Sequence, residues 1–194
     1  MKQKIIKIQS TAIPLPIENI DTDQICPARF LKAVSRENFG DHLFRDWRND
    51  KNFVLNSKKY SGEILVAGKN FGCGSSREHA VWALVDYGFK AVISSFFADI
   101  FKNNALNNSL LPVQISENFL RKLFHAIDKN SKTAIDINLE KQEIIIPILK
   151  LKERFEINYY KKICFMNGYD DIDYLLQMKS KVESYEKNNR SIAR

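Results

Sequence analysis

Apolar and polar residues follow two different spacings along the chain, and the change from one to the other marks the predicted elements. Short apolar runs at residues 63–67 (EILVA) and 90–94 (KAVIS) are typical of buried strands, and residues 76–87 between them have helical spacing. Strand, glycine-rich turn, helix and strand in this order predict a βαβ unit, and therefore a parallel sheet at this point. A helix over residues 97–108 and a strand over residues 110–115 are predicted to follow.

The rest of the chain adds further strands, one strongly amphipathic helix and a tail. Residues 4–8 resemble a first strand, and residues 133–137 and 143–149 alternate like two paired strands joined by a polar turn. Ser116 is expected to cap the amphipathic helix, whose apolar positions recur at helical spacing, namely Phe119, Leu120, Leu123, Phe124 and Ile127. The tail from about Asp170 is predicted to be a charged helix whose sparse apolar face could pack on this domain or meet a partner.

The sequence shows no repeat, low-complexity tract or linker that would divide the chain. We therefore expect one α/β domain over residues 1–194, with a C-terminal helical tail at about 168–190. Residues 13–16 are interpreted as a proline-punctuated connection, and residues 35–47 as a short helix or an irregular loop. Within residues 19–25 (NIDTDQI), aspartate and threonine are expected to hydrogen-bond to local backbone in a turn.

The charge balance narrows the classes of ligand. Lysine plus arginine (30) exceed aspartate plus glutamate (23), which gives a net charge of +7. This excess suits an anionic substrate, an acidic partner protein or nucleic acid. Much of it is lysine dispersed along the chain, which is more typical of a solvated surface than of a binding stripe.

Cysteines and histidines are too scattered to form a site of their own. The sequence has three of each, at Cys26, Cys73, Cys164, His42, His79 and His125. We therefore predict no disulfide framework and no metal site built by this chain alone. No apolar run is long enough for a signal peptide or a membrane span, so we expect a cytoplasmic protein.

Residues 68–80 (GKNFGCGSSREHA) carry the most informative pattern in the chain. Their glycines allow turns that side chains would forbid, and Ser75 followed by Glu78 matches a capping box that opens a helix at Ser75. The N–H groups at the start of that helix would then face the same point as the hydroxyls of Ser75 and Ser76 and the guanidinium of Arg77. This predicts a receptor for a carboxylate or phosphate, with a candidate nucleophile or base beside it. The structural alternative is a well-capped helix with a surface arginine.

The common nucleotide-binding motifs do not fit this segment. A Walker loop requires a lysine at a fixed place after its glycines, and none stands there. A dinucleotide fingerprint beginning at Gly72 would need a third glycine where Arg77 stands. The motif therefore implies no nucleotide.

Three segments together resemble a known family: residues 19–25, residues 68–80 and residues 97–113 (FADIFKNNALNNSLLPV), with a looser match at residues 167–176 (NGYDDIDYLL). The chain resembles the small subunits of bacterial 3-isopropylmalate dehydratase (isopropylmalate isomerase) in the aconitase superfamily. It is more distantly similar to the mobile C-terminal domain of aconitase. The resemblance covers nearly the whole length and implies a swivelling β/β/α domain that closes over an active site built by a separate large subunit.

The resemblance also implies a reaction and roles for residues. The enzyme would be a hydro-lyase of leucine biosynthesis, active only with its large subunit, that converts 2-isopropylmalate to 3-isopropylmalate by dehydration and rehydration. A [4Fe–4S] cluster is expected in the large subunit and no cofactor in this chain. By position in the motif, Ser75 falls on the catalytic base and Arg77 on its catalytic partner. Ser76 and Arg77 would bind a substrate carboxylate, with Asp23 and Gly74 in the supporting site.

Substrate recognition is expected in the segment that follows Asp23. Phe30, Leu31 and Lys32 are similar to the loop of isopropylmalate enzymes that receives the isopropyl group, although Phe30 and Leu31 could equally be core residues. Arg29 leaves the alignment of this loop open by one position. His79 could be an acid–base group or make a structural hydrogen bond, and Cys73 is expected to pack beside the turn.

Three other interpretations stay open. The chain could be the small subunit of a related hydratase that acts on homoaconitate or on a methylmalate or citraconate substrate. It could be a basic nucleic-acid-binding module, although no RNP or helix-turn-helix pattern is evident. It could also be a non-catalytic assembly partner, which fits poorly with an intact Gly-Ser-Ser-Arg sequence.

Overall fold

A computed structural model, which describes residues 3–32 and 38–189, gathers four short strands into one parallel sheet. The strand order is β2-β3-β4-β5, and every neighbouring pair runs parallel. The strands are β2 (Ala12–Leu15), β3 (Ile64–Ala67), β4 (Ala91–Ser94) and β5 (Leu111–Gln114). The βαβ unit and the parallel sheet predicted from the apolar pattern are confirmed.

A second sheet lies against the first and is antiparallel, with the order β1-β6-β7-β8. Its strands are β1 (Lys7–Ser10), β6 (Ile135–Asn138), β7 (Glu143–Ile146) and β8 (Leu151–Arg154). The predicted pairing of two strands across the polar turn is confirmed as β6 and β7. We did not predict β8, because three of its four residues are charged and its side chains are half-buried or exposed.

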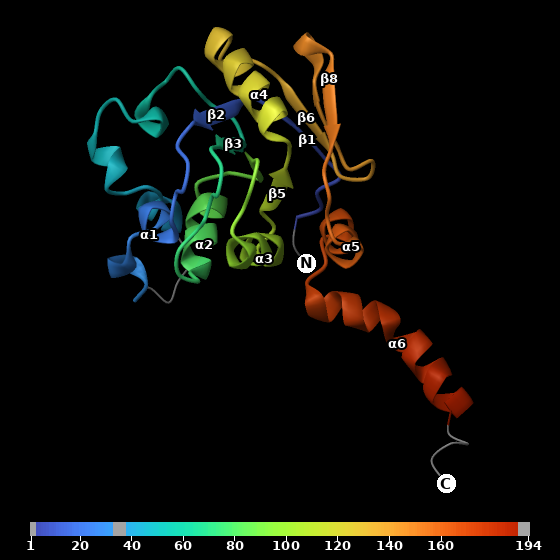
Figure 1. Ribbon diagram of the computed structural model, residues 1–194. Coiled ribbons are helices and arrows are strands. Elements are labelled where there is room, and N and C mark those ends of the chain that lie inside the picture. The colour runs from blue at the N-terminus through green and yellow to red at the C-terminus, as the bar shows by residue number, and fades with distance from the viewer. Residues whose placement is uncertain (1–2, 33–37, 190–194) are drawn as a thin grey trace.

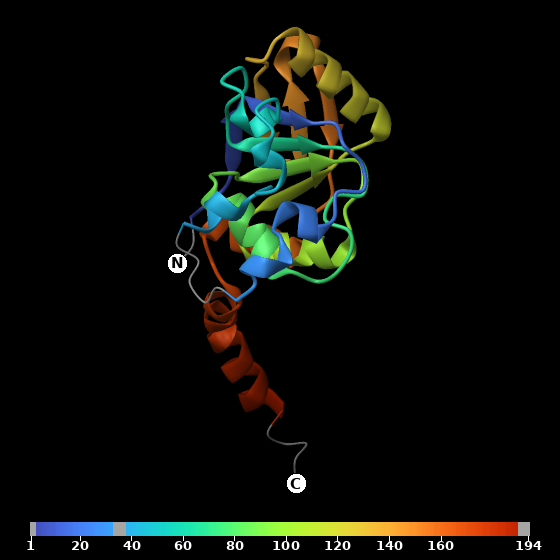
Figure 2. The same ribbon diagram turned by 90° about the vertical axis from the view of Figure 1, so that its left-hand side faces the viewer.

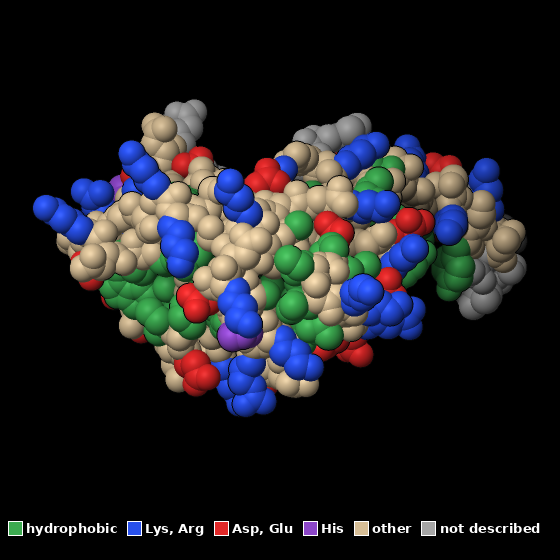
Figure 3. Space-filling view, turned by 90° about the horizontal axis from the view of Figure 1, so that it is seen from above, with side chains coloured by type: hydrophobic (Ala, Val, Ile, Leu, Met, Phe, Trp, Pro, Cys, Tyr) green, Lys and Arg blue, Asp and Glu red, His purple; other side chains and the backbone are tan. Residues whose placement is uncertain are grey.

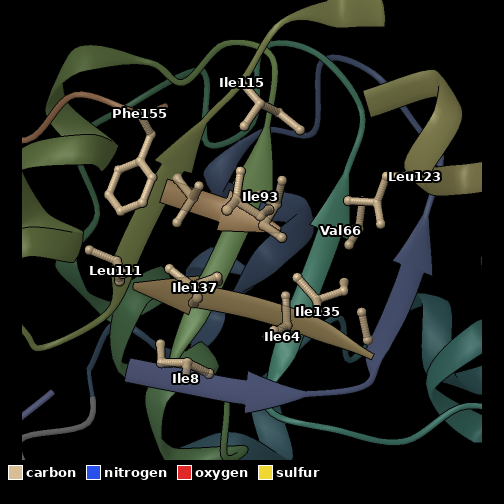
Figure 4. Close-up of a cluster of buried hydrophobic side chains, with 14 of the residues drawn as sticks. Ile8, Ile64, Val66, Ile93, Leu111, Ile115, Leu123, Ile135, Ile137 and Phe155 are labelled. Atoms are coloured by element: carbon tan, nitrogen blue, oxygen red, sulfur yellow. The ribbon is translucent and has the colours of Figure 1, made fainter. Parts of the chain in front are cut away.

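The parallel sheet is buried on both faces, which explains why its strands are continuously apolar. Ile64 and Val66 of β3 contribute to the cluster between the two sheets, where Ile135 and Ile137 of β6 meet them (Figure 4). Leu65 and Ala67 contribute to a second cluster on the opposite face, beneath the helices. The layers therefore follow the order antiparallel sheet, parallel sheet, helices.

Helices complete this arrangement (Figures 1 and 2). Ser116 accepts a hydrogen bond from the N–H of Phe119 and caps the predicted amphipathic helix, which packs into the cluster between the sheets. The α-helices are α1 (Thr22–Ile25), α2 (Glu78–Asp86), α3 (Asp99–Asn107), α4 (Glu117–Lys129), α5 (Tyr159–Asn167) and α6 (Asp171–Asn189). The 3-10 helices are η1 (Ala28–Phe30), η2 (Phe39–His42), η3 (Trp47–Asn49), η4 (Val54–Asn56) and η5 (Pro147–Leu149).

Prolines occupy both edges of the parallel sheet. Pro14 lies in β2, paired in register with Val66, and Pro112 lies in β5, paired with Val92. Proline has no N–H to donate, so within a sheet it is tolerated at an edge. Our interpretation of residues 13–16 as a connection was wrong, because the edge position allows Pro14 within a strand.

The C-terminal tail forms the predicted helix, α6. In both ribbon views it points away from the body, and it leaves from the end where α1, α2, α3 and α5 lie (Figures 1 and 2). None of the helices in the described ranges is long and apolar enough to cross a membrane. Of the segment 35–47, residues 35–37 lie outside the described residues, and the remainder contains the 3-10 helix η2.

Candidate active site

Three chain segments run side by side beyond the carboxyl ends of the parallel strands. The N–H of Gly72 donates to the carbonyl of Ile20 at 2.8 Å, which joins the segment after β3 to the segment after β2. The N–H of Ala98 donates to the carbonyl of Phe71 at 3.1 Å, which joins it to the segment after β4. The motif of residues 68–80 is thus held between two neighbours, at the edge where open α/β sheets bind ligands.

Two glycines shape the turn before the two serines. Gly72 has φ +75°, and a Cβ at this position would lie 2.2 Å from Cγ of Phe101. Gly74 has φ +85°, a left-handed conformation that glycine adopts without a steric penalty. Because both residues are glycines, the backbone can pass close to α3 at residue 72 and then turn outward to Ser75.

Thr22 fixes the backbone of the motif. Its N–H donates to the carbonyl of Cys73 at 3.0 Å, and its Oγ1 donates to the carbonyl of Ser75 at 2.8 Å. Thr22 is only 3% exposed, so these bonds are made away from competing water. Our expectation that this threonine bonds to local backbone was wrong, because its partners lie about fifty residues further along the chain.

The capping box predicted at Ser75 and Glu78 is absent. Helix α2 begins at Glu78 with Arg77 as its N-cap, in extended backbone, and no side chain caps it. The hydrogen bond from Thr22 and the left-handed Gly74 hold residues 74–76 outside the helix. The carboxylate of Glu78 instead accepts from Nδ2 of Asn108 at 2.8 Å. The positive end of the α2 dipole is therefore not met by a capping side chain at Arg77.

A capping box does exist one segment earlier, at α1. Oδ1 of Asp21 accepts from the N–H of Gln24 at 2.7 Å, and Oε1 of Gln24 accepts from the N–H of Asp21 at 2.8 Å. The Asp-x-x-Gln spacing matches the box pattern and could have predicted this short helix from sequence. The box fixes the turn that presents Thr22 and Asp23.

Asp23 orients Arg77. Nη1 of Arg77 donates to Oδ1 of Asp23, and the same oxygen accepts from the N–H of Ala28 at 2.9 Å. The Arg77 guanidinium, helped by the Ala28 N–H, holds the pKa of the Asp23 carboxyl below its ordinary value. A guanidinium carries five donors in a planar fork, so this contact positions Arg77 and leaves donors available for a ligand.

These groups meet in one cavity of about 250 Å³. Both polar and apolar residues line it, namely Thr22, Gly72, Gly74, Ser75, Ser76, Arg77, Ala98, Asp99, Ile100 and Phe101. Ser75 and Ser76 are exposed, so both hydroxyls can reach a ligand. Larger hollows of about 420, 430 and 460 Å³ lie elsewhere, and the first is also lined by Ser95, Ser116 and Arg154. None of the three is lined by residues of the 68–80 motif, so the motif rather than size identifies the candidate site.

The expected recognition loop lies beside this cavity and does not line it. Phe30 is half-buried and stacks on His42, with ring centroids 3.9 Å apart. Arg29 forms an ion pair with Asp46 and lies over the Phe30 ring at 4.7 Å. Leu31 is half-buried and Lys32 is exposed. The hydrogen bond from Ala28 to Asp23 connects this loop to Arg77.

Neither His79 nor Cys73 lines the cavity. The His79 ring contacts Trp82 at 4.4 Å and Phe39 at 5.6 Å between centroids, which makes it part of an aromatic cluster. The Cys73 thiol donates to the carbonyl of Asn19 at 3.3 Å, and its partial burial raises the pKa of the thiol. Cys73 thus packs beside the turn as expected.

Metal ligands do not gather around the cavity. Among residues 3–32 and 38–189, no group of three or more His, Cys, Asp or Glu side chains is placed to hold a metal ion. The chemistry that this chain itself offers consists of hydroxyls, a guanidinium and a helix N-terminus.

Comparisons with known proteins agree with one another. Residues 2–118 match the family model of the aconitase C-terminal domain. A 3-isopropylmalate dehydratase small subunit from Azobacteroides pseudotrichonymphae is 60% identical over 96% of this chain and 98% of its own. One from Cytophaga hutchinsonii is 57% identical over 98% of both chains. The crystal structure of a 3-isopropylmalate dehydratase from Methanocaldococcus jannaschii superposes with a TM-score of 0.67 at 30% identity, covering 92% of this chain and 99% of that one.

Proposed function

Because the chain belongs to the family of the aconitase C-terminal domain, we propose that it is the small subunit of a 3-isopropylmalate dehydratase. The reaction would convert 2-isopropylmalate to isopropylmaleate by loss of water and then to 3-isopropylmalate by rehydration, as a step of leucine biosynthesis. The observation that carries this proposal is the single cavity in which Ser75, Ser76 and Arg77 meet. The family also agrees with the β/β/α order of layers, so the predicted fold class is confirmed.

Ser75 is the proposed base. Each elimination removes a C–H proton next to a carboxylate, and a neutral serine is too weak a base for that step. Its alkoxide needs positive potential nearby, which the uncapped start of α2 and the Arg77 guanidinium supply. The oxygen of Ser75 would take the proton during dehydration and return it to the neighbouring carbon during rehydration.

Arg77 and Ser76 are the proposed carboxylate ligands. A guanidinium can hold a carboxylate with two parallel hydrogen bonds, which fixes the face of the substrate that meets Ser75. Asp23 prevents Arg77 from turning away, and Gly74 allows the backbone to present both hydroxyls. Ile100 and Phe101 add apolar surface to the lining of the same cavity.

The departing hydroxyl requires a Lewis acid, and residues 3–32 and 38–189 contain no cluster of His, Cys, Asp or Glu placed to hold a metal ion. The [4Fe–4S] cluster expected in the large subunit would supply that chemistry. Partnership with a large subunit agrees with the names of the relatives, which are called small subunits. Closure of the swivelling domain over that partner would exclude water and strengthen the electrostatic interactions of Ser75 and Arg77.

Phe30, Leu31 and Lys32 stay the proposed recognition segment. They do not line the cavity, so they would reach the substrate from its rim, within the closed complex. The hydrogen bond from Ala28 to Asp23 supports this proposal because it ties the loop to the residue that orients Arg77. A related hydratase that acts on homoaconitate or methylmalate would share the Ser75 chemistry and differ here.

A nucleic-acid-binding module is the second function class. The face in Figure 3 bears lysine and arginine side chains that are dispersed and mixed with acidic ones, rather than gathered into a stripe. A strong decrease in affinity for nucleic acid with rising salt would favour this alternative.

The test is reconstitution with a candidate large subunit under anaerobic conditions. Formation of isopropylmaleate from 2-isopropylmalate, followed by ultraviolet absorbance, is the expected result. Competition with homoaconitate and 2-methylmalate distinguishes the related hydratases. An active complex that turns over either competitor and leaves isopropylmalate untouched would overturn the substrate assignment.

A further inference from the structure

Helix α6 presents an apolar stripe to solvent. Ile172, Leu175, Leu176 and Val182 are between 51% and 68% exposed, although buried positions are the usual place for such side chains. Leu175, Met178 and Val182 follow the three-and-four spacing with which a helix contacts another helix or a groove. These four exposed residues together with Met178 are called the α6 stripe below.

The start of α6 is fixed to the body by α5. The Tyr160 hydroxyl donates to Oδ1 of Asp171 at 2.5 Å, and Nζ of Lys161 lies 2.9 Å from the same oxygen. The rings of Tyr160 and Tyr174 meet edge to face at 4.5 Å. The first turn therefore sets the direction in which the rest of the helix leaves the body (Figures 1 and 2).

Beyond that turn, the apolar side chains of α6 stand in solvent. Most of the stability of a helix in a protein comes from packing of its apolar face rather than from intrinsic propensity. The α6 stripe points into solvent along a helix of 19 residues. The structure thus shows a helix that is anchored at its first turn and exposes its apolar face.

We propose that the α6 stripe docks into an apolar groove of the large subunit. This inference rests on the proposed function, which requires a large subunit to cover the Ser75 cavity. The cavity lies among α1, α2 and α3, and α6 leaves from the same end of the molecule (Figures 1 and 2). Ile100, which lines the cavity, is itself an apolar side chain that is 52% exposed. A partner that covers the cavity can therefore cover the stripe as well.

A second copy of this chain is a poorer occupant. The spacing from Leu175 to Val182 covers one heptad, whereas a self-sufficient coiled coil needs about three to four. Two such helices alone would leave the cavity uncovered and bury less apolar surface than a stable interface requires. A helix that extends an interface already formed around the active site needs no independent stability.

The test compares two double variants of the full chain with matched charge. Leu175→Glu with Val182→Glu places two carboxylates on the stripe, and Gln177→Glu with Ser184→Glu places two on the opposite face of α6. The measurements are the dissociation constant for the large subunit, the helical circular dichroism of each variant, and turnover at saturating large subunit. We expect the stripe variant to bind at least about tenfold more weakly. The control should bind within about twofold of wild type, and both should reach wild-type turnover at saturation.

The outcomes separate this inference from the proposed function. Equal affinity of the stripe variant and wild type overturns the α6 inference, whether or not the complex is active. Loss of self-association in the stripe variant with unchanged affinity for the large subunit also overturns it, in favour of a second copy. An inactive wild-type complex overturns the proposed function, and the affinity comparison still decides whether α6 binds that subunit.

Discussion

Asp23 and Arg77 lie 54 positions apart in the chain and form an ion pair in which Nη1 donates to Oδ1. The arginine side chain is 17% exposed and the aspartate 56%, so the guanidinium is sheltered while its partner stands at the rim. Because Oδ1 also accepts from the N–H of Ala28, one carboxylate connects the proposed carboxylate ligand to the proposed recognition loop. A substrate that displaces Arg77 should therefore also shift the recognition loop, and the reverse should hold as well.

Ser75→Ala should abolish most of the turnover and leave the fold intact. The hydroxyl is exposed, so the free energy of unfolding should change by less than about 0.5 kcal/mol. Loss of a positioned base typically lowers kcat by about 10²–10⁴-fold. Steady-state kinetics of the reconstituted complex and thermal unfolding measure these two effects.

Ser76→Ala is the matched control for this variant. It removes a neighbouring exposed hydroxyl from the same cavity, and we expect mainly a higher KM because Ser76 is proposed to bind substrate. If both variants show the same kinetic defect, or if Ser75→Ala keeps near-normal kcat, Ser75 is not the base.

Thr22→Val should lower both stability and turnover. The change keeps the shape of the side chain and removes the partly buried hydrogen bond to the carbonyl of Ser75, at a cost of about 0.5–1.5 kcal/mol. Thr133→Val provides the control, because Thr133 is also 3% exposed and donates to backbone carbonyls far from the cavity, at Ala126 and Asn130. Both variants should unfold more readily in urea, and only Thr22→Val should reduce kcat.

Asp23→Asn should reveal a pH-dependent contribution of the ion pair to stability. The folded pKa of Asp23 is lowered, so its contribution is fully present above the ordinary carboxyl value of about 4 and is lost as pH falls through the lowered value. The difference in midpoint of unfolding between wild type and Asp23→Asn should be constant above about pH 5 and shrink in acid. A difference that instead grows in acid would contradict the assigned direction of the pKa shift.

Gly72→Ala should destabilise the protein far more than Gly88→Ala. Both positions have positive φ, +75° and +110°, so both variants pay about 1–2 kcal/mol in backbone strain. A Cβ at Gly88 meets no atom within 4 Å, whereas one at Gly72 would lie 2.2 Å from Phe101. Overpacking should add about 1–3 kcal/mol at Gly72. Chemical denaturation of the two variants measures the difference, and equal losses would show that Phe101 moves aside freely.

The sequence predicted elements whose signals are local. The apolar run of β3, the glycine turn and the spacing of α2 lie next to one another, so periodicity found them. The predicted start of α2 at Ser75 was wrong, because α2 begins at Glu78. A hydrogen bond from Thr22 to the carbonyl of Ser75 holds this segment outside the helix, and the local sequence does not indicate that bond. The ion pair between Asp23 and Arg77 could not be predicted from periodicity either. The two residues come together because β2 and β3 are neighbouring parallel strands.

Some signals were present and were missed. Asn158 accepts from the N–H groups of Tyr160 and Lys161, and Gly168 ends α5 in a left-handed conformation with φ +71°. An asparagine before and a glycine after a segment of nine residues are helix start and stop signals. The exposure of α6 could not have been foreseen, because a sparse apolar face has the same pattern whether it packs on its own domain or on a partner.

The prolines at both outer strands have a consequence for how this subunit meets other proteins. A missing donor at Pro14 and at Pro112 interrupts any ladder that a foreign strand could build along either margin of the parallel sheet. At these two edges, contact with another protein is expected to involve side chains rather than a row of backbone hydrogen bonds. Such edges keep the parallel sheet from pairing with strands of other proteins.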